Sequence, residues 1–259
     1  MKKVKSYAKV NLLLKVIEKK ENGYHELQMV NKKVNLCDEI TIEYSEYDEV
    51  YISNDIDTSF IKNVLTRIKE KYSIKKSYKI TIDKNSPIGA GLGGASVNAA
   101  TIIDTILTLE NIDDKAMNKI NNFKDLGADI PYAFFNDDAI VEGIGEKIYI
   151  IEKKITKPLV LVNPNIFVST KEVFEKNKKY SCKYTHEYIM NNIDNDSLYI
   201  NELEESSFEL NDVLRKLKLN LSKYGKTVMS GTGSSFIVHS DKYQQIKEEF
   251  PDYLVIKIN

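Results

Sequence analysis

Four glycines within six residues form the first candidate site in the sequence. Gly89, Gly91, Gly93 and Gly94 lie in the segment PIGAGLGGASVNAA, residues 87–100, directly before a predicted helix. Glycines let successive backbone N–H groups turn toward one point, and the N-terminus of the following helix adds a partial positive charge. The pattern therefore predicts a loop that binds a di- or triphosphate. A flexible turn or a close helix packing contact has the same glycine pattern and is the alternative.

Two other phosphate-binding loops have related spacing. Gly89, Gly91 and Gly94 satisfy the dinucleotide-binding spacing, and Glu110 falls near the offset of the acid that binds a ribose. That acid ends a second parallel strand, whereas Glu110 ends the predicted helix with no strand before it, and Pro87 breaks the tight entry from strand to loop. A Walker loop is excluded because no Gly-Lys-Ser/Thr follows. We therefore do not expect a redox dinucleotide.

The elements that must position this loop follow from hydrophobic periodicity. Residues 2–17 alternate with a period of two, which predicts a strand with one face on the core and with Lys9 and Asn11 together on the other face. A strand over 78–83 enters the glycine loop, and a helix over 96–110 leaves it. Further strands are predicted at 30–36, 39–44, 49–53, 139–142, 147–152, 159–163 and 253–258, with helices at 59–72, 114–123, 170–177 and 211–224, a turn at 21–23 and a surface loop at 191–197. This mixed order favours an α+β fold with domains over residues 1–156 and 157–259.

Composition limits the classes of partner. Lys and Arg number 37 against 38 for Asp and Glu, so the net charge of -1 provides no basic field for nucleic acid. Cys37 and Cys182 are far apart, which indicates neither a disulfide framework nor a zinc site. No apolar run reaches the roughly 18 residues that a membrane span needs, and the N-terminal apolar run is too short for a signal peptide. A cytoplasmic protein without nucleic-acid or membrane partners is predicted.

Several segments together resemble those of the GHMP kinases. Residues 87–96 resemble the ATP-binding motif of that family. Three further sets of residues resemble one branch of the family, and their order and spacing match over nearly the whole chain. These sets are Ala8-Lys9-Val10-Asn11-Leu12 followed by Gly23-Tyr24-His25, residues 126–131 (LGADIP) and residues 230–233 (SGTG). The resemblance implies a two-domain GHMP-kinase fold with the active site in the interdomain cleft. It also implies transfer of the γ-phosphoryl of ATP, with Mg²⁺, to the 2-hydroxyl of a cytidine-diphosphate-linked methylerythritol.

The resemblance assigns the phosphoryl-transfer chemistry to Asp129 and Lys9. Asp129 would orient the substrate hydroxyl and accept its proton late, because a carboxylate is too weak a base to ionise an alcohol beforehand. Lys9 would pair with Asp129, keep it ionised and offset charge on the transferred phosphoryl group. Position alone favours ordinary roles, with Asp129 capping a helix that begins near Pro131 and Lys9 solvated. No acidic pair has metal-ligand spacing, so we assign no protein metal ligand.

The same resemblance assigns the ligand contacts. The expected ATP-binding residues are Pro87, Gly89, Gly91, Leu92, Gly93, Gly94, Ala95 and Ser96. The expected substrate-binding residues are Asn11, Tyr24, His25, Thr170 and Phe174. Tyr24 and Phe174 would enclose the cytosine ring and His25 would hydrogen-bond its edge. Stacking contributes about 1–3 kcal/mol per base but tolerates any base, so discrimination must come from the edge contacts. The ordinary alternatives are a surface hairpin for Tyr24 and His25, a helix core position for Phe174 and an N-cap for Ser96.

Two other functions remain open. Another GHMP kinase, acting on a sugar alcohol or a mevalonate-like acid, would have no use for the base-stacking Tyr24 and the adjacent His25. A non-catalytic binding protein on the same fold would be expected to lack Lys9 or Asp129, and both are present. The sequence does not predict an oligomeric state.

Overall fold

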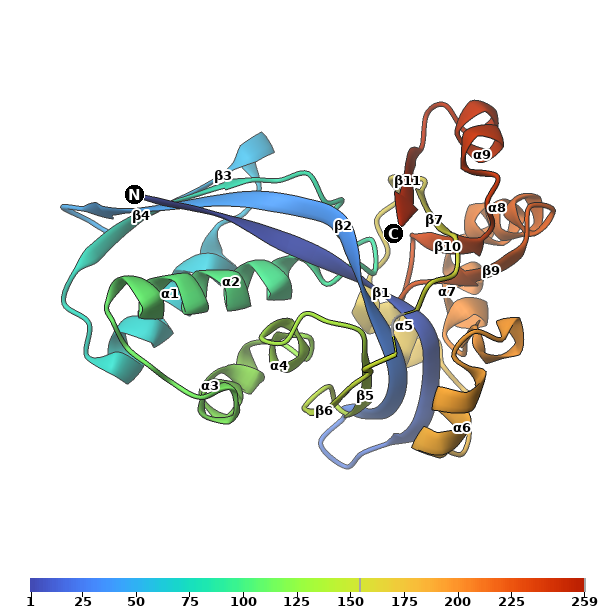
Figure 1. Cartoon of the computed structure of the whole chain (residues 1–259), viewed down its shortest axis with the longest axis horizontal. Coiled ribbons are helices and arrows are strands. Elements are labelled where there is room, and N and C mark those ends of the chain that lie inside the picture. Colours follow the sequence, from blue (N-terminus) through green and yellow to red (C-terminus); the bar gives the residue numbers. More distant parts are fainter. Residues whose placement is uncertain (154, 259) are drawn as a thin grey trace. The chain divides into compact units, whose positions relative to one another are not determined.

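The computed structural model describes residues 1–153 and 155–258, and the chain divides into two compact units. Unit 1 contains residues 1–8, 36–86 and 94–136, and unit 2 contains residues 9–35, 87–93 and those from 137 onward. Two long strands, β1 (Lys2–Lys19) and β2 (His25–Ser45), contribute residues to both units (Figure 1). The units are compact regions rather than tested folding domains, so the domain boundary predicted at residue 157 stays a prediction.

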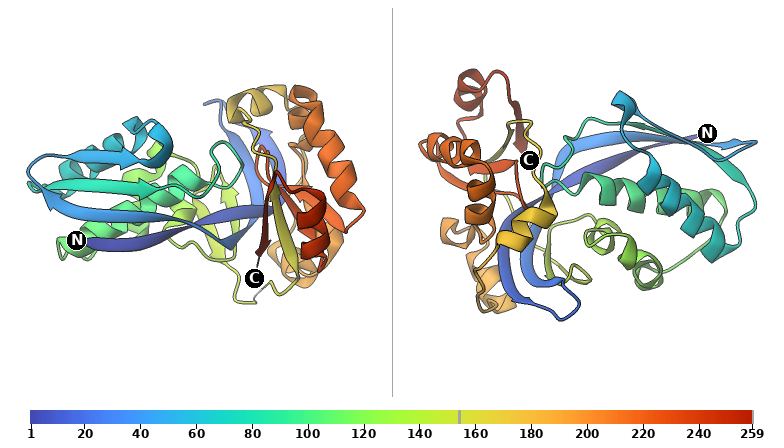
Figure 2. Two further views of the ribbon diagram at one scale, coloured as in Figure 1. Left: turned by 90° about the horizontal axis from the view of Figure 1, so that it is seen from above. Right: turned by 180° about the vertical axis from the view of Figure 1, so that it is seen from behind.

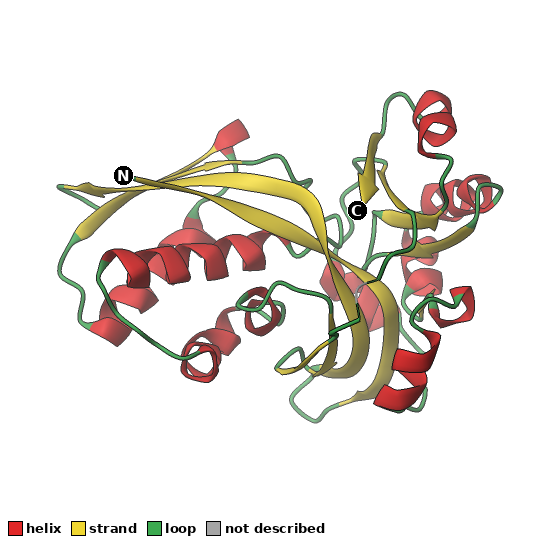
Figure 3. Cartoon of the chain, in the orientation of Figure 1, coloured by secondary structure: helices red, strands yellow, loops and turns green. Residues whose placement is uncertain are grey.

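Unit 1 is a sheet with helices on one face. The strand order is β3 (Glu49–Ile52), β4 (Ser77–Asp83), β2 and β1, with β3 parallel and β2 antiparallel to β4. Helices α1 (Ser59–Tyr72) and α2 (Gly94–Leu109) run along the sheet (Figures 1 and 3). Their apolar sides form one core with the strands, including Ile40, Ile42, Ile80, Ile82, Val64, Ile68, Ile102, Ile103 and Ile106. The smaller elements are η1 (Ser53–Asp55), α3 (Ala116–Phe123), η2 (Lys124–Leu126) and α4 (Ile130–Ala133).

Helix α1 shows why these bounds follow from the sequence. Its apolar residues recur at helical spacing, and four of them are buried: Ile61, Val64, Leu65 and Ile68. The Asp57 carboxylate accepts a hydrogen bond from the Ser59 backbone N–H at 3.0 Å, which satisfies one of the unpaired donors of the first turn. At the other end Ser73 adopts a left-handed conformation and its N–H donates to the Lys69 carbonyl. Residues close to the helix in the sequence therefore determine where it begins and where it ends.

Unit 2 contains two groups of strands (Figure 2). The hairpin of β5 (Ala139–Gly143) and β6 (Lys147–Ile150) pairs with β2, and β8 (Ile200–Asn201) pairs in parallel with β1. A separate antiparallel sheet has the order β11 (Leu254–Ile258), β7 (Leu159–Asn163), β10 (Phe236–His239) and β9 (Lys226–Met229). The helical elements are α5 (Thr170–Lys176), α6 (His186–Asn192), η3 (Asp196–Leu198), α7 (Glu204–Leu210), α8 (Asp212–Ser222) and α9 (Tyr243–Glu249).

The structure confirms the α+β class and most of the predicted elements. Helix α1 and strand β7 have the predicted bounds, and the strands predicted at 139–142 and 147–152 are present as β5 and β6. The strands predicted at 30–36 and 39–44 are a single strand, β2. The surface loop predicted at 191–197 is wrong in part, because α6 and η3 occupy much of it. Helices α7 and α9 were not predicted.

The first strand departs from its predicted pattern in unit 2. Residues 8–16 are buried on both faces, and Lys9 and Asn11 are only 4% and 1% exposed. The expectation of one solvated face, and with it the solvated alternative for Lys9, is therefore wrong here. Part of the physical reason is that two loops lie along this strand: the Lys9 N–H donates to the Leu92 carbonyl at 3.1 Å, and the Asn11 N–H donates to the Ser230 hydroxyl at 3.0 Å. Throughout the described ranges no helix is both long and apolar enough to cross a membrane.

Candidate active site

The predicted phosphate loop has the backbone conformation that its glycines allow. Gly89, Gly91 and Gly93 have φ angles of 60°, 74° and 65°, in the left-handed region that residues with a side chain rarely adopt. The Leu92 carbonyl accepts the hydrogen bond from Lys9, so the loop lies directly against β1. Residues 87–93 of the loop thus belong to the same unit as Lys9 and Asn11.

A second glycine turn, residues 230–235 between β9 and β10, packs against this loop. A Cβ atom on Gly91 would lie 2.0 Å from the Ser230 carbonyl oxygen, and one on Gly231 would lie 3.1 Å from the Gly91 Cα. The Ser230 hydroxyl donates to the Gly91 carbonyl at 2.8 Å, and the Ser235 N–H donates to the Ala90 carbonyl at 3.2 Å. The two turns meet backbone to backbone, so Gly91 is required for their contact as well as for its own φ angle.

Lys9 belongs to a buried chain of polar side chains. Its ammonium donates to the Asn11 Oδ1 at 2.9 Å, and the Asn11 Nδ2 donates to the Asn31 Oδ1 at 2.6 Å. Lys9 and Asn11 point the same way, as the strand period predicted. Asn31 on β2 was missed because Lys32 and Lys33 follow it, so nothing in the local sequence distinguishes it from a polar surface position. A buried ammonium is stabilised by such oxygen partners, and here they also fix its direction.

In unit 1 the glycine segment continues as the first turn of α2. The helix begins at Gly94, so Ser96 is its third residue and the N-cap alternative for Ser96 is wrong. The Ser96 Oγ lies 3.3 Å from where a Cβ on Gly127 would be, which places residue 127 next to this turn. Asp129 stands at the N-cap position of α4 with Pro131 in the first turn, but its side chain makes no capping hydrogen bond. The structure therefore does not contain the hydrogen bond that a capping role for Asp129 requires.

A carboxylate that the sequence analysis missed holds the junction between β4 and the glycine loop. Asp38 is 1% exposed, and it accepts hydrogen bonds from the backbone N–H groups of Asn85 and Ser86 at 2.9 and 2.8 Å. It also forms an ion pair with Lys84, whose Nζ lies 2.6 Å from the Ser86 Oγ. A Cβ on Gly94 would lie 2.9 Å from that Nζ. The Lys84–Asp38 ion pair thus lies at the N-terminus of α2, with its ammonium beside Gly94.

The predicted base-reading residues lie in unit 2. The His25 ring, at the start of β2, stacks on the Phe174 ring of α5 with their centroids 4.8 Å apart and an interplanar angle of 26°. Burial, with the charge of Lys19 as a smaller cause, lowers the pKa of His25 below its ordinary value. The His25 Nε2 is buried and has no hydrogen-bond partner. Tyr24, beside it, is 55% exposed. The structure therefore brings His25 and Phe174 together and leaves Tyr24 on the surface.

Thr170 and one unpredicted ring lie near the glycine turns of unit 2. Thr170 opens α5, and its Oγ1 is 3.1 Å from the Oγ1 of Thr232 in the second glycine turn. The Phe167 ring lies against the first glycine loop: a Cβ on Gly89 would be 2.4 Å from its Cδ2. Within the described part of the chain, no three or more His, Cys, Asp or Glu side chains gather as a metal site.

Comparison with known proteins assigns the chain to a class and then to a family. The model for the N-terminal domain of GHMP kinases matches residues 59–136, a segment that contains the first turn of α2 and Asp129. The chain is 31% identical to the 4-diphosphocytidyl-2-C-methyl-D-erythritol kinase of Clostridium beijerinckii, over 98% of this chain and 99% of that protein. It is 30% identical to the kinase of the same name from Thermoanaerobacter pseudethanolicus, over 96% and 91%.

Solved structures confirm the fold. A crystal structure of 4-(cytidine 5'-diphospho)-2C-methyl-D-erythritol kinase matches with a TM-score of 0.84 over 99% of this chain and 98% of that one, at 23% identity. The mevalonate kinase of Methanococcus jannaschii matches with a TM-score of 0.66 over 99% and 97%, at 14% identity. The chain therefore has the GHMP-kinase fold. With relatives of 30% and 31% identity that match over at least nine-tenths of their length, it belongs to the 4-diphosphocytidyl-2-C-methyl-D-erythritol kinase family.

Proposed function

We propose that this protein uses ATP to phosphorylate the 2-hydroxyl of 4-diphosphocytidyl-2-C-methyl-D-erythritol in the non-mevalonate pathway to isoprenoid precursors. The observation that carries the proposal is the His25–Phe174 pair, in which a stacked imidazole keeps a buried nitrogen without a partner. A mevalonate-like acid or a small sugar alcohol has no base edge for such a nitrogen to bind. Because the reaction consumes ATP, we place it in the cytoplasm.

The glycine loop and the first turn of α2 would bind the triphosphate of ATP. The contacts are those proposed from the sequence: Pro87, Gly89, Gly91, Leu92, Gly93, Gly94, Ala95 and Ser96. Left-handed glycines and the helix N-terminus supply N–H groups, and Lys84 supplies an ammonium beside Gly94. Mg²⁺ usually keeps several waters and binds to phosphate oxygens, which fits a site with the Ser96 hydroxyl and no cluster of protein carboxylates among the described residues. When bound it would neutralise charge on the phosphates.

In the transfer itself, the substrate hydroxyl oxygen bonds to the γ-phosphorus while the bond to the β–γ bridging oxygen breaks and ADP leaves. Asp129 would orient the hydroxyl and take its proton as the phosphoryl group transfers. Lys9 would offset the charge on that group. The Asn11 Oδ1 holds the Lys9 ammonium in one direction at 2.9 Å, so the charge is preorganised rather than carried on a flexible side chain. Asn11 is also proposed to contact the substrate.

The cytosine would be read by His25, with Phe174 and Tyr24 against its faces and Thr170 as a polar contact. A lowered pKa keeps the imidazole neutral near pH 7, so that the ring has one N–H donor and one acceptor nitrogen. Cytosine presents an amino donor at N4, where uracil presents a carbonyl acceptor. A neutral imidazole that accepts from the amino group therefore favours cytosine.

A coupled assay of ADP release tests the proposal. The purified protein is given ATP and Mg²⁺ with 4-diphosphocytidyl-2-C-methyl-D-erythritol, mevalonate, homoserine or galactose, and turnover is expected with the first alone. Turnover with one of the other three but not with the first would contradict it. Asp129→Asn keeps the size of the side chain but removes the carboxylate, and we expect kcat to fall by about 10²–10⁴. Normal turnover by this variant would remove Asp129 from the mechanism.

A further inference from the structure

His25 makes a second ring contact that the proposed function does not use. The Tyr180 ring lies almost parallel to the imidazole, at an interplanar angle of 12° and with the centroids 6.4 Å apart. Both this contact and the one with Phe174 fall within the range of offset stacking. Tyr180 lies beyond the end of α5 and is 45% exposed, so the core does not hold it. Its place beside His25 must come from the segment that carries it.

The backbone next to Tyr180 is tied to β1. The Ser181 N–H donates to the Val16 carbonyl at 2.9 Å. The Ser181 hydroxyl donates to the Glu202 Oε2 at 3.0 Å, and the same oxygen accepts the Val16 N–H at 2.7 Å. Glu202 is buried, and a buried carboxylate that accepts two hydrogen bonds is costly to release into a disordered arrangement. The segment thus starts from a fixed point on β1.

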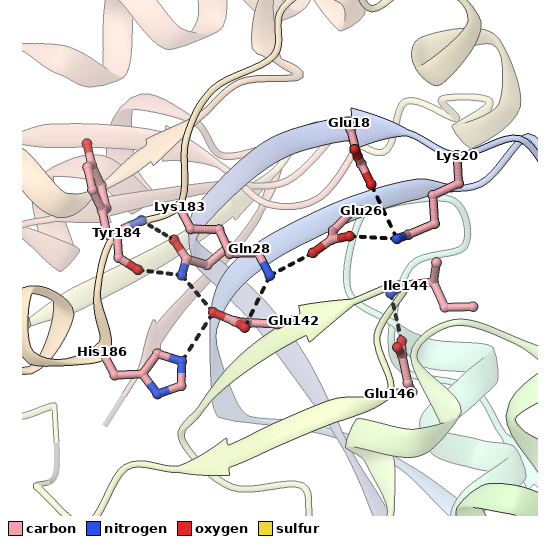
Figure 4. A network of polar contacts seen from close by, with 10 residues as sticks. All are labelled: Glu18, Lys20, Glu26, Gln28, Glu142, Ile144, Glu146, Lys183, Tyr184 and His186. Carbon is pink, nitrogen blue, oxygen red and sulfur yellow. Dashed lines mark hydrogen bonds and ion pairs between the residues drawn. The ribbon is translucent and has the colours of Figure 1, made fainter.

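The segment is also tied to β2, directly after His25. The Lys183 ammonium lies 2.7 Å from the Glu26 Oε1, and Gln28 makes two hydrogen bonds with the Tyr184 backbone, each 2.8 Å long. Figure 4 shows Lys183 and Tyr184 facing Glu26, Gln28 and Glu142. The residues that follow Tyr180 are therefore bound to the residues that follow His25. This arrangement fixes the two rings relative to each other.

We propose that Tyr180 positions the His25 imidazole for reading the edge of a pyrimidine, a role that rests on the proposed kinase function. Contact through the ring face restricts the orientation of the imidazole and leaves its edge atoms for the base. The Nε2, buried and without a partner, is such an atom. Loss of the Tyr180 ring lets the imidazole turn and lets water reach it, so the selectivity for cytosine over uracil falls.

The alternative is that Tyr180 stacks on the base itself. Stacking on an aromatic ring tolerates any base, so a residue that stacked directly would weaken the cytidine and uridine substrates equally when removed. A residue that positions the edge reader weakens the cytidine substrate more. The ratio of kcat/KM for the two substrates therefore separates the two roles.

The experiment compares Tyr180→Leu, Tyr180→Phe and the control Tyr253→Leu with the unmodified protein. Tyr253 likewise stacks on another ring, that of Phe250, with the centroids 5.5 Å apart, and it lies just before β11. Each protein is assayed with 4-diphosphocytidyl-2-C-methyl-D-erythritol and its uridine counterpart at saturating ATP. For Tyr180→Leu we expect KM for the cytidine substrate to rise and the cytidine-to-uridine ratio of kcat/KM to fall about tenfold, the effect of losing one oriented hydrogen bond, with kcat within about twofold. Tyr180→Phe keeps the ring and should restore the ratio, and Tyr253→Leu should leave it unchanged.

An unchanged ratio in Tyr180→Leu, or equal losses for both substrates, would overturn the positioning role while leaving the proposed kinase function intact. If the unmodified protein had no activity with the cytidine substrate, the proposed function would fail instead. Should Tyr180→Leu not fold, Lys183→Met loosens the same segment without removing a ring. We expect it to lower the ratio in the same direction, and an unchanged ratio in that variant would count against the proposal.

Discussion

Replacing Gly91 with alanine tests how tightly the two glycine turns of unit 2 are joined. An added Cβ would lie 2.0 Å from the Ser230 carbonyl oxygen, and real Cβ atoms almost never approach closer than 3.0 Å. The backbones must therefore separate by about 1 Å or more. A shift of about 1 Å at a site that positions reactants can cost about 10²-fold in rate. Alanine at the φ angle of 74° adds a left-handed penalty of about 1–2 kcal/mol.

Gly23→Ala is the matched control. Gly23 has a similar φ angle of 84°, and its added Cβ would meet nothing within 4 Å. It therefore carries the left-handed penalty without the collision. Urea unfolding gives the stability of both variants, and the ADP-release assay gives kcat/KM for ATP. We expect Gly91→Ala to lose more stability than Gly23→Ala, and to lose about 10² in kcat/KM for ATP where Gly23→Ala stays near the original value. If the two variants behaved alike in both measurements, the backbone contact would not matter and the reasoning would be refuted.

Two further predictions concern buried or paired carboxylates. Asp38→Asn leaves the buried Lys84 ammonium without its ion pair, so we expect the free energy of unfolding, measured in urea, to fall by about 3 kcal/mol. The double variant Asp38→Asn/Lys84→Met should recover part of that loss. Equal stability of Asp38→Asn and the original protein would contradict this prediction. Hydrogen bonds from Lys183 and then Lys20 lower the pKa of Glu26 to about 2, so the stability that Glu26 contributes is present above pH 4.5 and is lost as the pH falls from there toward 2. The melting temperature should therefore differ less between pH 5 and pH 3 in Glu26→Gln than in the original protein. The same pH dependence in both proteins would show that Glu26 does not contribute to it.

Periodicity predicted the elements that position the site because each has a strong local signal. Helix α1 combines regular apolar spacing with a carboxylate at its start, and β7 is a short apolar run that is buried throughout. Helix α7 has no such signal: it is seven residues long, its two central serines are buried, and tertiary packing stabilises it. The continuity of β2 was missed because Cys37 and Asp38 looked like a break between two strands.

The site was predicted as residue types but not as contacts. The glycine spacing indicated an anion loop, yet nothing in the spacing shows that Gly91 meets Ser230, which is 139 residues away. Asp38 was missed for the same reason, since its partners are 47 and 48 residues further along the chain. Tyr180 had no signal of its own, because its position depends on hydrogen bonds made by its neighbours. Long-range pairing of this kind is set by the tertiary fold rather than by local pattern.

The Ser230 hydroxyl links the two groups on which the proposed chemistry depends. It accepts from the Asn11 N–H at 3.0 Å and donates to the Gly91 carbonyl at 2.8 Å, while Asn11 holds the Lys9 ammonium. The strand that carries Lys9 and the loop proposed to bind ATP therefore share one hydrogen-bonded atom. A change at the second glycine turn reaches both at once, so its effects on ATP binding and on phosphoryl transfer should not be independent. This coupling gives the second turn a place in the function although neither of its glycines needs to touch a ligand.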